Sequence, residues 1–152
     1  MWHEQIDGAE TGSWKRLRTI AAAAFGLTLA GAAAAATQVR DPALTRTSEQ
    51  GQFRVQISSD ASPIPMRRIH SWTIRLADDG GHSVERATIK VDGGMPEHHH
   101  GLPTQPEVAA TETPGVYKIN GVRFSMTGWW VFNLDIATPD GRADTVTFNV
   151  TL

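Results

Sequence analysis

The sequence of 152 residues contains no cysteine, which excludes disulfide bridges, thiol nucleophiles, cysteine-based zinc sites and iron–sulfur clusters. It also lacks an excess of positive charge. Its 14 Lys and Arg residues face 16 Asp and Glu residues, a net charge of -2, so the main task is not the binding of nucleic-acid phosphates. The length suits one domain of ordinary size, which must be held together by apolar burial alone.

Motifs of common enzyme classes are missing as well. The chain has no Gly-x-Ser-x-Gly elbow, no His-Glu-x-x-His and no glycine-rich phosphate loop between a strand and a helix. Gly93-Gly94 is followed by Met-Pro, so no helix N-terminus is available there for a phosphate. We therefore predict that the protein is not an enzyme.

Residues 1–36 have the composition of an export signal. The basic residues Lys15, Arg16 and Arg18 precede an uncharged, alanine-rich apolar run that ends at Ala36. This order is typical of a cleaved signal peptide. The alternative is an N-terminal membrane anchor, although the run is shorter than the roughly 20 apolar residues that a spanning helix needs. Both interpretations predict a periplasmic or other extracytoplasmic location, the second with attachment to the inner membrane.

The remaining chain divides into a polar segment and a strand-rich domain. Residues 37–50 show no hydrophobic period and are predicted to be a flexible linker. In residues 51–152 apolar side chains recur at every second position, which is the period of β-strands. Such runs lie at 53–57, 70–76, 87–91, 117–119, 122–126, 130–136 and 146–152. About seven short strands without helices predict an all-β, antiparallel immunoglobulin-like β-sandwich, with an up-and-down barrel as the alternative.

Two local features refine this prediction. Asn120-Gly121 lies between two apolar stripes and predicts a two-residue β-hairpin. Trp129 has the opposite parity to the core-facing Trp130, so its side chain is expected on the solvent face unless another segment covers it.

One predicted loop, residues 92–106, has an unusual composition. It contains three consecutive histidines, a methionine and three prolines, and long loops in compact domains tend to be functional or disordered. Prolines favour order here because they restrict the unfolded chain. Imidazole and thioether together suit copper, especially Cu(I).

The candidate metal ligands follow from strand parity. In an extended segment His98 and His100 point to one side and His99 to the other. Two more residues end apolar stripes and could join if the loop crosses that end of the sandwich. The candidate ligands are Met95, His98, His100, Met126 and His70. The competing interpretation is structural: methionines often fill cores, and a histidine on an apolar face is often hydrogen-bonded to backbone.

The segments Gly94-Met-Pro-Glu-His-His-His-Gly101, Gly115-Val-Tyr117 and Phe124-Ser-Met-Thr-Gly-Trp129 resemble the YtkA-like/FixH-like families of bacterial envelope proteins. The resemblance covers roughly residues 72–152. It implies a small extracytoplasmic β-sandwich, and some relatives are associated with cation or copper handling and respiratory-oxidase assembly. The family's methionines and spaced histidines match Met95, His98, His100 and Met126. FixH-like members carry an N-terminal membrane anchor.

Two functional hypotheses result. The first is an extracytoplasmic protein that binds a copper ion and acts in metal handling or respiratory-complex metallation, with an envelope protein as metal recipient. The second is a non-catalytic envelope interaction domain whose His loop is structural. Neither involves nucleic acid, and contact with a membrane is expected only through an uncleaved N-terminal segment.

Overall fold

A computed structural model describes residues 44–152, so the predicted signal or anchor segment and residues 37–43 of the linker lie outside the described part. Among the described residues no helix is long and apolar enough to cross a membrane. The regular elements are β1 (Thr45–Thr47), β2 (Phe53–Ser59), β3 (His70–Asp78), β4 (Thr88–Met95), the 3-10 turn η1 (Pro96–His98), β5 (His100–Gly101), β6 (Glu107–Ala110), β7 (Val116–Val122), β8 (Trp129–Ala137) and β9 (Ala143–Thr151).

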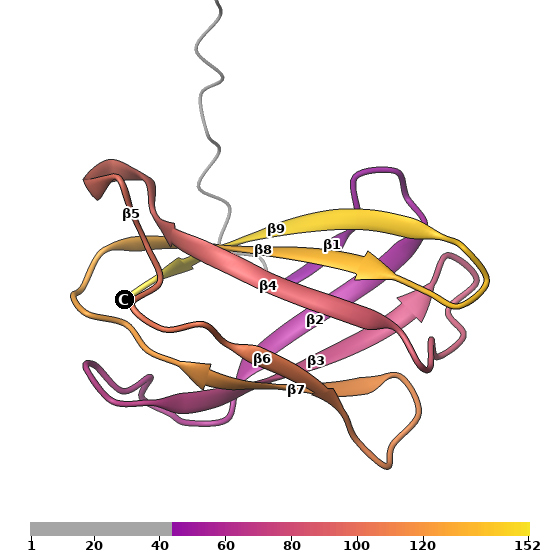
Figure 1. Ribbon diagram of the computed structural model, residues 1–152, viewed down its shortest axis with the longest axis horizontal. Helices are drawn as coiled ribbons and strands as arrows, with labels where there is room; N and C mark the ends of the chain where they lie inside the picture. Colours follow the sequence, from indigo (N-terminus) through magenta and orange to yellow (C-terminus); the bar gives the residue numbers. More distant parts are fainter. Residues whose placement is uncertain (1–43) are drawn as a thin grey trace, which may run out of the picture. The chain divides into compact units, whose positions relative to one another are not determined.

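The strands form two sheets that pack face to face (Figure 1). One sheet has the order β1-β2-β3-β7-β6 and the other β5-β4-β8-β9. All the strand pairs within these sheets are antiparallel. This confirms the predicted all-β antiparallel sandwich. The short strands β1, β5 and β6 were not predicted, because they are too short to show a hydrophobic period.

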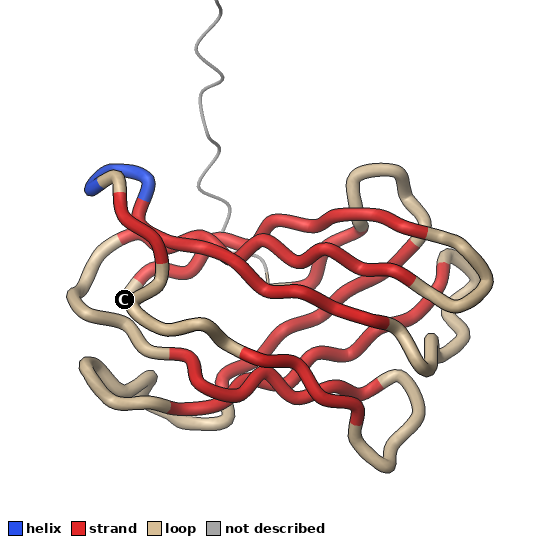
Figure 2. The backbone as a smooth tube through the Cα atoms, viewed as in Figure 1, coloured by secondary structure: helices blue, strands red, loops and turns tan. Residues whose placement is uncertain are grey.

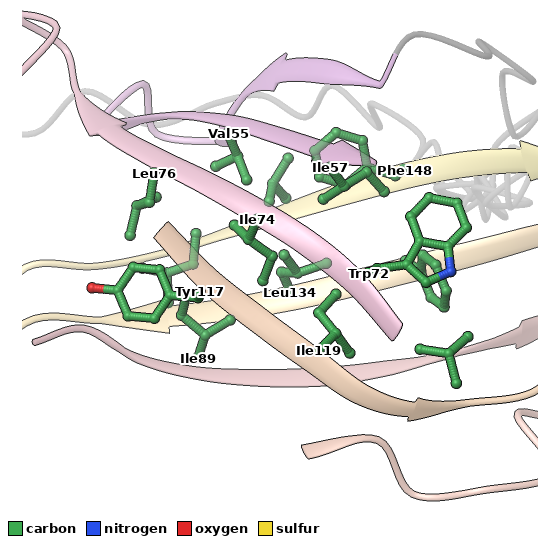
Figure 3. Close-up of a cluster of buried hydrophobic side chains, with 14 of the residues drawn as sticks. Val55, Ile57, Trp72, Ile74, Leu76, Ile89, Tyr117, Ile119, Leu134 and Phe148 are labelled. Carbon is green, nitrogen blue, oxygen red and sulfur yellow. The ribbon is translucent and has the colours of Figure 1, made fainter. Parts of the chain in front are cut away.

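The core lies between the sheets and consists of the side chains at alternate strand positions (Figure 3). In β2 the side chains of Phe53, Val55 and Ile57 are at most 1% exposed. Trp72 in β3 packs edge-on against Phe132 of β8, with ring centroids 5.3 Å apart. Within residues 44–152 every buried core residue lies between positions 53 and 150. A fragment of residues 37–152 therefore contains the described core and the described strands, and is expected to fold on its own.

The predicted hairpin at Asn120-Gly121 is wrong. β7 continues through both residues, with Gly121 in the left-handed region at φ 86°. His70 pairs with Val122 but Trp72 with Ile119, so the extra residue in β7 makes a β-bulge against β3. A glycine with positive φ can occupy either a β-bulge or a hairpin turn. Here β7 pairs with β3 on both sides of Gly121, so the glycine forms a bulge.

Strand β1 lies inside the segment predicted to be a linker. Thr45–Thr47 pairs with β2, and Ser48 directly after it is only 4% exposed. The Ser48 hydroxyl donates a hydrogen bond to the Asp144 carboxylate of β9 at 2.5 Å. The sandwich therefore begins before residue 51. The segment around β1 is polar in sequence although Ser48 is buried. A serine suits this position because its partner is the buried Asp144 carboxylate and not an apolar surface.

Tyr117 ties the five-stranded sheet to the connection that crosses to β4. Its hydroxyl donates a hydrogen bond to the Val84 carbonyl at 2.8 Å and accepts one from the Ala87 amide at 3.0 Å. Tyr117→Phe is expected to lower the free energy of unfolding by about 1–3 kcal/mol, because both backbone groups lose their partner. Urea unfolding of the 37–152 fragment measures this. Ser71→Ala, which removes an exposed hydrogen bond to Asn120, is the control, and an equal effect of the two variants would contradict the prediction.

Candidate metal site at one end of the sandwich

The segment predicted as a loop at 92–106 begins as a strand. β4 continues to Met95 and turns through η1 into β5, where His100 pairs with Met95. We call residues 93–101 the His hairpin; it lies at the left of Figure 1, with η1 blue in Figure 2. The strand was missed because Gly93 and Gly94 interrupt the apolar period.

Close backbone packing explains both glycines. A Cβ at Gly94 would lie 2.3 Å from the His100 carbonyl oxygen, and one at Gly93 would lie 2.2 Å from the Val131 carbonyl oxygen. Only glycine lets β4 fit between β5 and β8 at this point. The hairpin is therefore held closely against the four-stranded sheet.

The tight turn decides where the three histidines lie. Pro96 starts η1, and His99 adopts a left-handed conformation at φ 54° and ψ 36°. The parity prediction assumed an extended chain, but the chain turns at these residues. His98 and His100 nevertheless come together, with ring centroids 6.0 Å apart and planes at 30°. Both side chains are exposed to solvent.

This separation fits two ligands of one ion. Metal–nitrogen bonds of about 2 Å place an ion about 3.2 Å from each imidazole centroid, so two rings on one ion lie up to about 6.4 Å apart. Nδ1 of His100 lies 3.0 Å from the Gly101 carbonyl oxygen. If Nδ1 carries the proton and donates this hydrogen bond, Nε2 has a free lone pair for a metal ion. Ligating histidines usually donate their other ring N–H in this way.

Met95 lies directly across the hairpin from His100. It is 1% exposed and belongs to the core. A Cβ at Gly128 would lie 2.8 Å from the Met95 methyl group, so this glycine makes room for the thioether. Directly opposed residues of an antiparallel pair share one face of the sheet, so the buried Met95 thioether and the solvent-exposed His100 imidazole lie on the same face of the hairpin.

Met126 reaches the same end from the β7–β8 connection and is 40% exposed. Trp130 connects this methionine to the His hairpin. Its indole Nε1 donates a hydrogen bond to the Met126 carbonyl at 3.1 Å, and its ring packs edge-on against His100 with centroids 5.6 Å apart. Strand parity predicts only that Trp130 is buried; no sequence signal points to this double contact.

His70 lies at this end of the sandwich but belongs to the opposite sheet. Its Nδ1 is 3.1 Å from the Arg68 carbonyl oxygen, and its Nε2 accepts a hydrogen bond from Trp72 Nε1 at 3.1 Å. Its ring also lies 5.5 Å from that of Phe124. In this arrangement neither ring nitrogen offers a free lone pair, so the contacts of His70 are those of a structural histidine.

A metal ion at this end of the sandwich would need ligands other than histidine and carboxylate. Within residues 44–152 no three His, Asp or Glu side chains are grouped closely enough to hold a metal ion. An ion bound by His98 and His100 would therefore need thioether or solvent as further ligands. Two neutral imidazoles with one or two thioethers form a soft, uncharged donor set that suits Cu(I) better than Zn²⁺, Ca²⁺ or Mg²⁺.

Trp129 was expected on the solvent face unless another segment covers it, and it is only 7% exposed. Its Nε1 donates a hydrogen bond to Asn149 Oδ1 at 2.9 Å. Asn149 is itself 6% exposed. Trp129 is therefore not an open docking surface for a partner.

Comparisons with known proteins bear on the family and on the fold. A family model described as YtkA-like matches residues 46–135, which include the His hairpin, Met126 and Trp130. A DUF4426 family protein from Pseudomonas aeruginosa PAO1 has a similar structure, with a TM-score of 0.51 and 13% identity over 72% of this chain and 94% of that one. This likeness supports the fold alone.

A second solved structure, the ZirS C-terminal domain, aligns over 96% of this chain and 88% of its own. Its TM-score is 0.39 at 14% identity. No curated protein matches the sequence.

Proposed function

The chain belongs to the YtkA-like family, and on that basis we propose that it is an extracytoplasmic metal-binding protein that holds one copper ion at the His hairpin. His98 and His100 supply two imidazoles, and Met95 and Met126 supply thioethers. The protein acts in metal handling or in metallation of a respiratory complex, and passes the ion to an envelope protein. Residues 1–36 direct export or anchor the domain to the membrane.

The stacked pair His98–His100 is the observation that carries this proposal. Two exposed imidazoles 6.0 Å apart, one with Nδ1 at a backbone carbonyl, have a separation that two ligands of one ion can have, and this supports the proposal. Glycines and a proline hold the turn in this shape without a ligand, which lowers the cost of ordering it on binding. His70 is left out of the ligand set because its nitrogens are already bonded.

Competition with a Cu(I)-specific chromophoric chelator under anaerobic conditions tests the proposal on the 37–152 fragment. The expected result is one Cu(I) per chain, bound far more tightly than Zn²⁺. If folded and denatured fragments compete equally, the metal hypothesis is wrong. The His hairpin is then a structural brace in a non-catalytic interaction domain.

Trp130 is expected to position the two halves of the site. Trp130→Phe keeps an aromatic ring beside His100 but removes the hydrogen bond to the Met126 carbonyl. We expect Cu(I) affinity to fall about 2–13-fold, the equivalent of one hydrogen bond of about 0.5–1.5 kcal/mol. Trp129→Phe is the matched control, because the wild-type indole of Trp129 donates its hydrogen bond to Asn149 and not to the Met126 carbonyl. Equal affinities of the two variants would contradict the positioning role.

A further inference from the structure

A groove of about 280 Å³ lies on the outer face of the five-stranded sheet, at the end opposite the His hairpin. Strands β1, β2, β3 and β7 form its floor, and the connections β3–β4 and β6–β7 form its wall. The lining residues are Thr45, Arg54, Gln56, Arg75, Leu76, Ala77, Ser83, Pro114, Gly115 and Val116. We call it the Arg groove.

Two arginines share this groove on neighbouring strands. Arg54 of β2 pairs with Ala77 of β3, and Arg75 lies two residues before Ala77 on the same face. Diagonal neighbours of this kind are about 7–8 Å apart at their Cα atoms, within reach of one ligand for long side chains. Both arginines are exposed.

The positive charge of the groove has no carboxylate partner among the described residues. No acidic residue lines the groove, and neither arginine forms an ion pair with the described carboxylates. Lys118 on the same sheet face differs, because it pairs with Asp60 at 2.7 Å. Two adjacent guanidinium groups repel each other, so this arrangement is not expected to stabilise the fold. An anion bound between them would account for it.

The wall of the groove is built by close packing. Leu76 N–H donates a hydrogen bond to the Gly115 carbonyl at 2.8 Å. A Cβ at Gly115 would lie 2.7 Å from the Leu76 carbonyl oxygen and 2.9 Å from Ser83 Cβ, at a φ of 71°. Glycine therefore brings both connections against the strand. The small side chain of Ala77 leaves the floor open between the arginines and this wall.

We propose that the Arg groove binds a small organic oxyanion. Its phosphate or carboxylate head is held between the guanidinium groups of Arg54 and Arg75, which form charge-assisted, paired hydrogen bonds with such groups. Its apolar body packs on Ala77, Pro114 and Val116, and Ser83 supplies a further donor. The volume is below that of drug-sized pockets and limits the ligand to about the size of a single ring. This proposal is independent of the metal site.

Phenyl phosphate is the test ligand, measured by calorimetry and by its effect on the melting temperature of the 37–152 fragment, at constant ionic strength. We expect saturable binding and an increased melting temperature, as for any ligand that binds only the folded state. Inorganic phosphate is expected to bind more weakly, because it lacks the apolar body, and uncharged phenol not at all. Phosphate and carboxylate heads are compared by replacing phenyl phosphate with benzoate.

Variants locate the site. Arg54→Gln and Arg75→Gln are each expected to weaken phenyl phosphate binding about tenfold while leaving the melting temperature without ligand unchanged or higher. Arg68→Gln, at the opposite end of the sandwich, is the matched control for net charge. Absence of saturable binding by the wild type, an equal loss with Arg68→Gln, or an equal response to phenol would each overturn the proposal.

Discussion

Replacement of both His98 and His100 with alanine is expected to abolish Cu(I) binding while the fold stays intact. The two rings are exposed and do not belong to the apolar core, which His100 touches at Trp130. Without them, only thioethers and water remain to coordinate an ion at this end, and these bind too weakly to compete with a chelator. Each single variant should retain reduced affinity, since one imidazole remains.

Anaerobic chelator competition measures this effect, with thermal unfolding as the check on folding. His82→Ala is the matched control: it removes another exposed histidine from the far end of the sandwich, where the ring lies beside Asp78. Its Cu(I) affinity should equal that of the wild type. Undiminished binding by the double variant would show that the ion is held elsewhere and that the His hairpin is not the site.

Asp144→Ala is expected to cause the largest loss of stability among polar substitutions. The carboxylate is 4% exposed and accepts hydrogen bonds from the Ser48 hydroxyl and from the amides of Gln50, Gln52 and Thr145. It thereby ties the β1–β2 connection to β9. Alanine leaves the buried Ser48 hydroxyl and three part-buried amides without this acceptor. A donor left without a partner costs about 1–3 kcal/mol when no water replaces the oxygen. We expect a total loss of about 3 kcal/mol.

The same carboxylate makes stability depend on pH. Burial by itself raises the pKa of Asp144, but the hydrogen bonds from Ser48, Gln50, Thr145 and Gln52 outweigh it and hold the pKa below the ordinary value of 3.8. The charged form is therefore stabilised by folding. This contribution is fully present above the unfolded-state pKa, near pH 4, and is lost as pH falls through the lower folded-state value.

Urea unfolding at pH 7 and at acid pH tests both statements. Asp144→Ala should be much less stable than the wild type at pH 7, and the difference should shrink at acid pH. Asp135→Ala, in the neighbouring strand on the exposed face, is the control and should change stability by less than about 0.5 kcal/mol. A pH-independent difference would mean that Asp144 acts by packing rather than by charge.

Strand periodicity by itself determined the architecture. The alternation of apolar side chains in β2, β3, β8 and β9 depends only on which residues are apolar, because successive strand residues point to opposite faces. It therefore predicted both the core and the sandwich. The candidate site was predicted from composition and not from periodicity: three histidines beside a methionine indicate soft-metal chemistry whatever their conformation.

Only the tertiary structure decided the details that depend on a distant partner. Gly121 forms a bulge because β3 pairs with β7 on both sides of it. Ser48 is buried because the Asp144 carboxylate, 96 residues away, accepts its hydrogen bond. His70 differs from His100 because Trp72 donates a hydrogen bond to its Nε2. Local sequence encodes conformational preference and chemistry, but the choice among several allowed roles is made by long-range contacts that no local pattern contains.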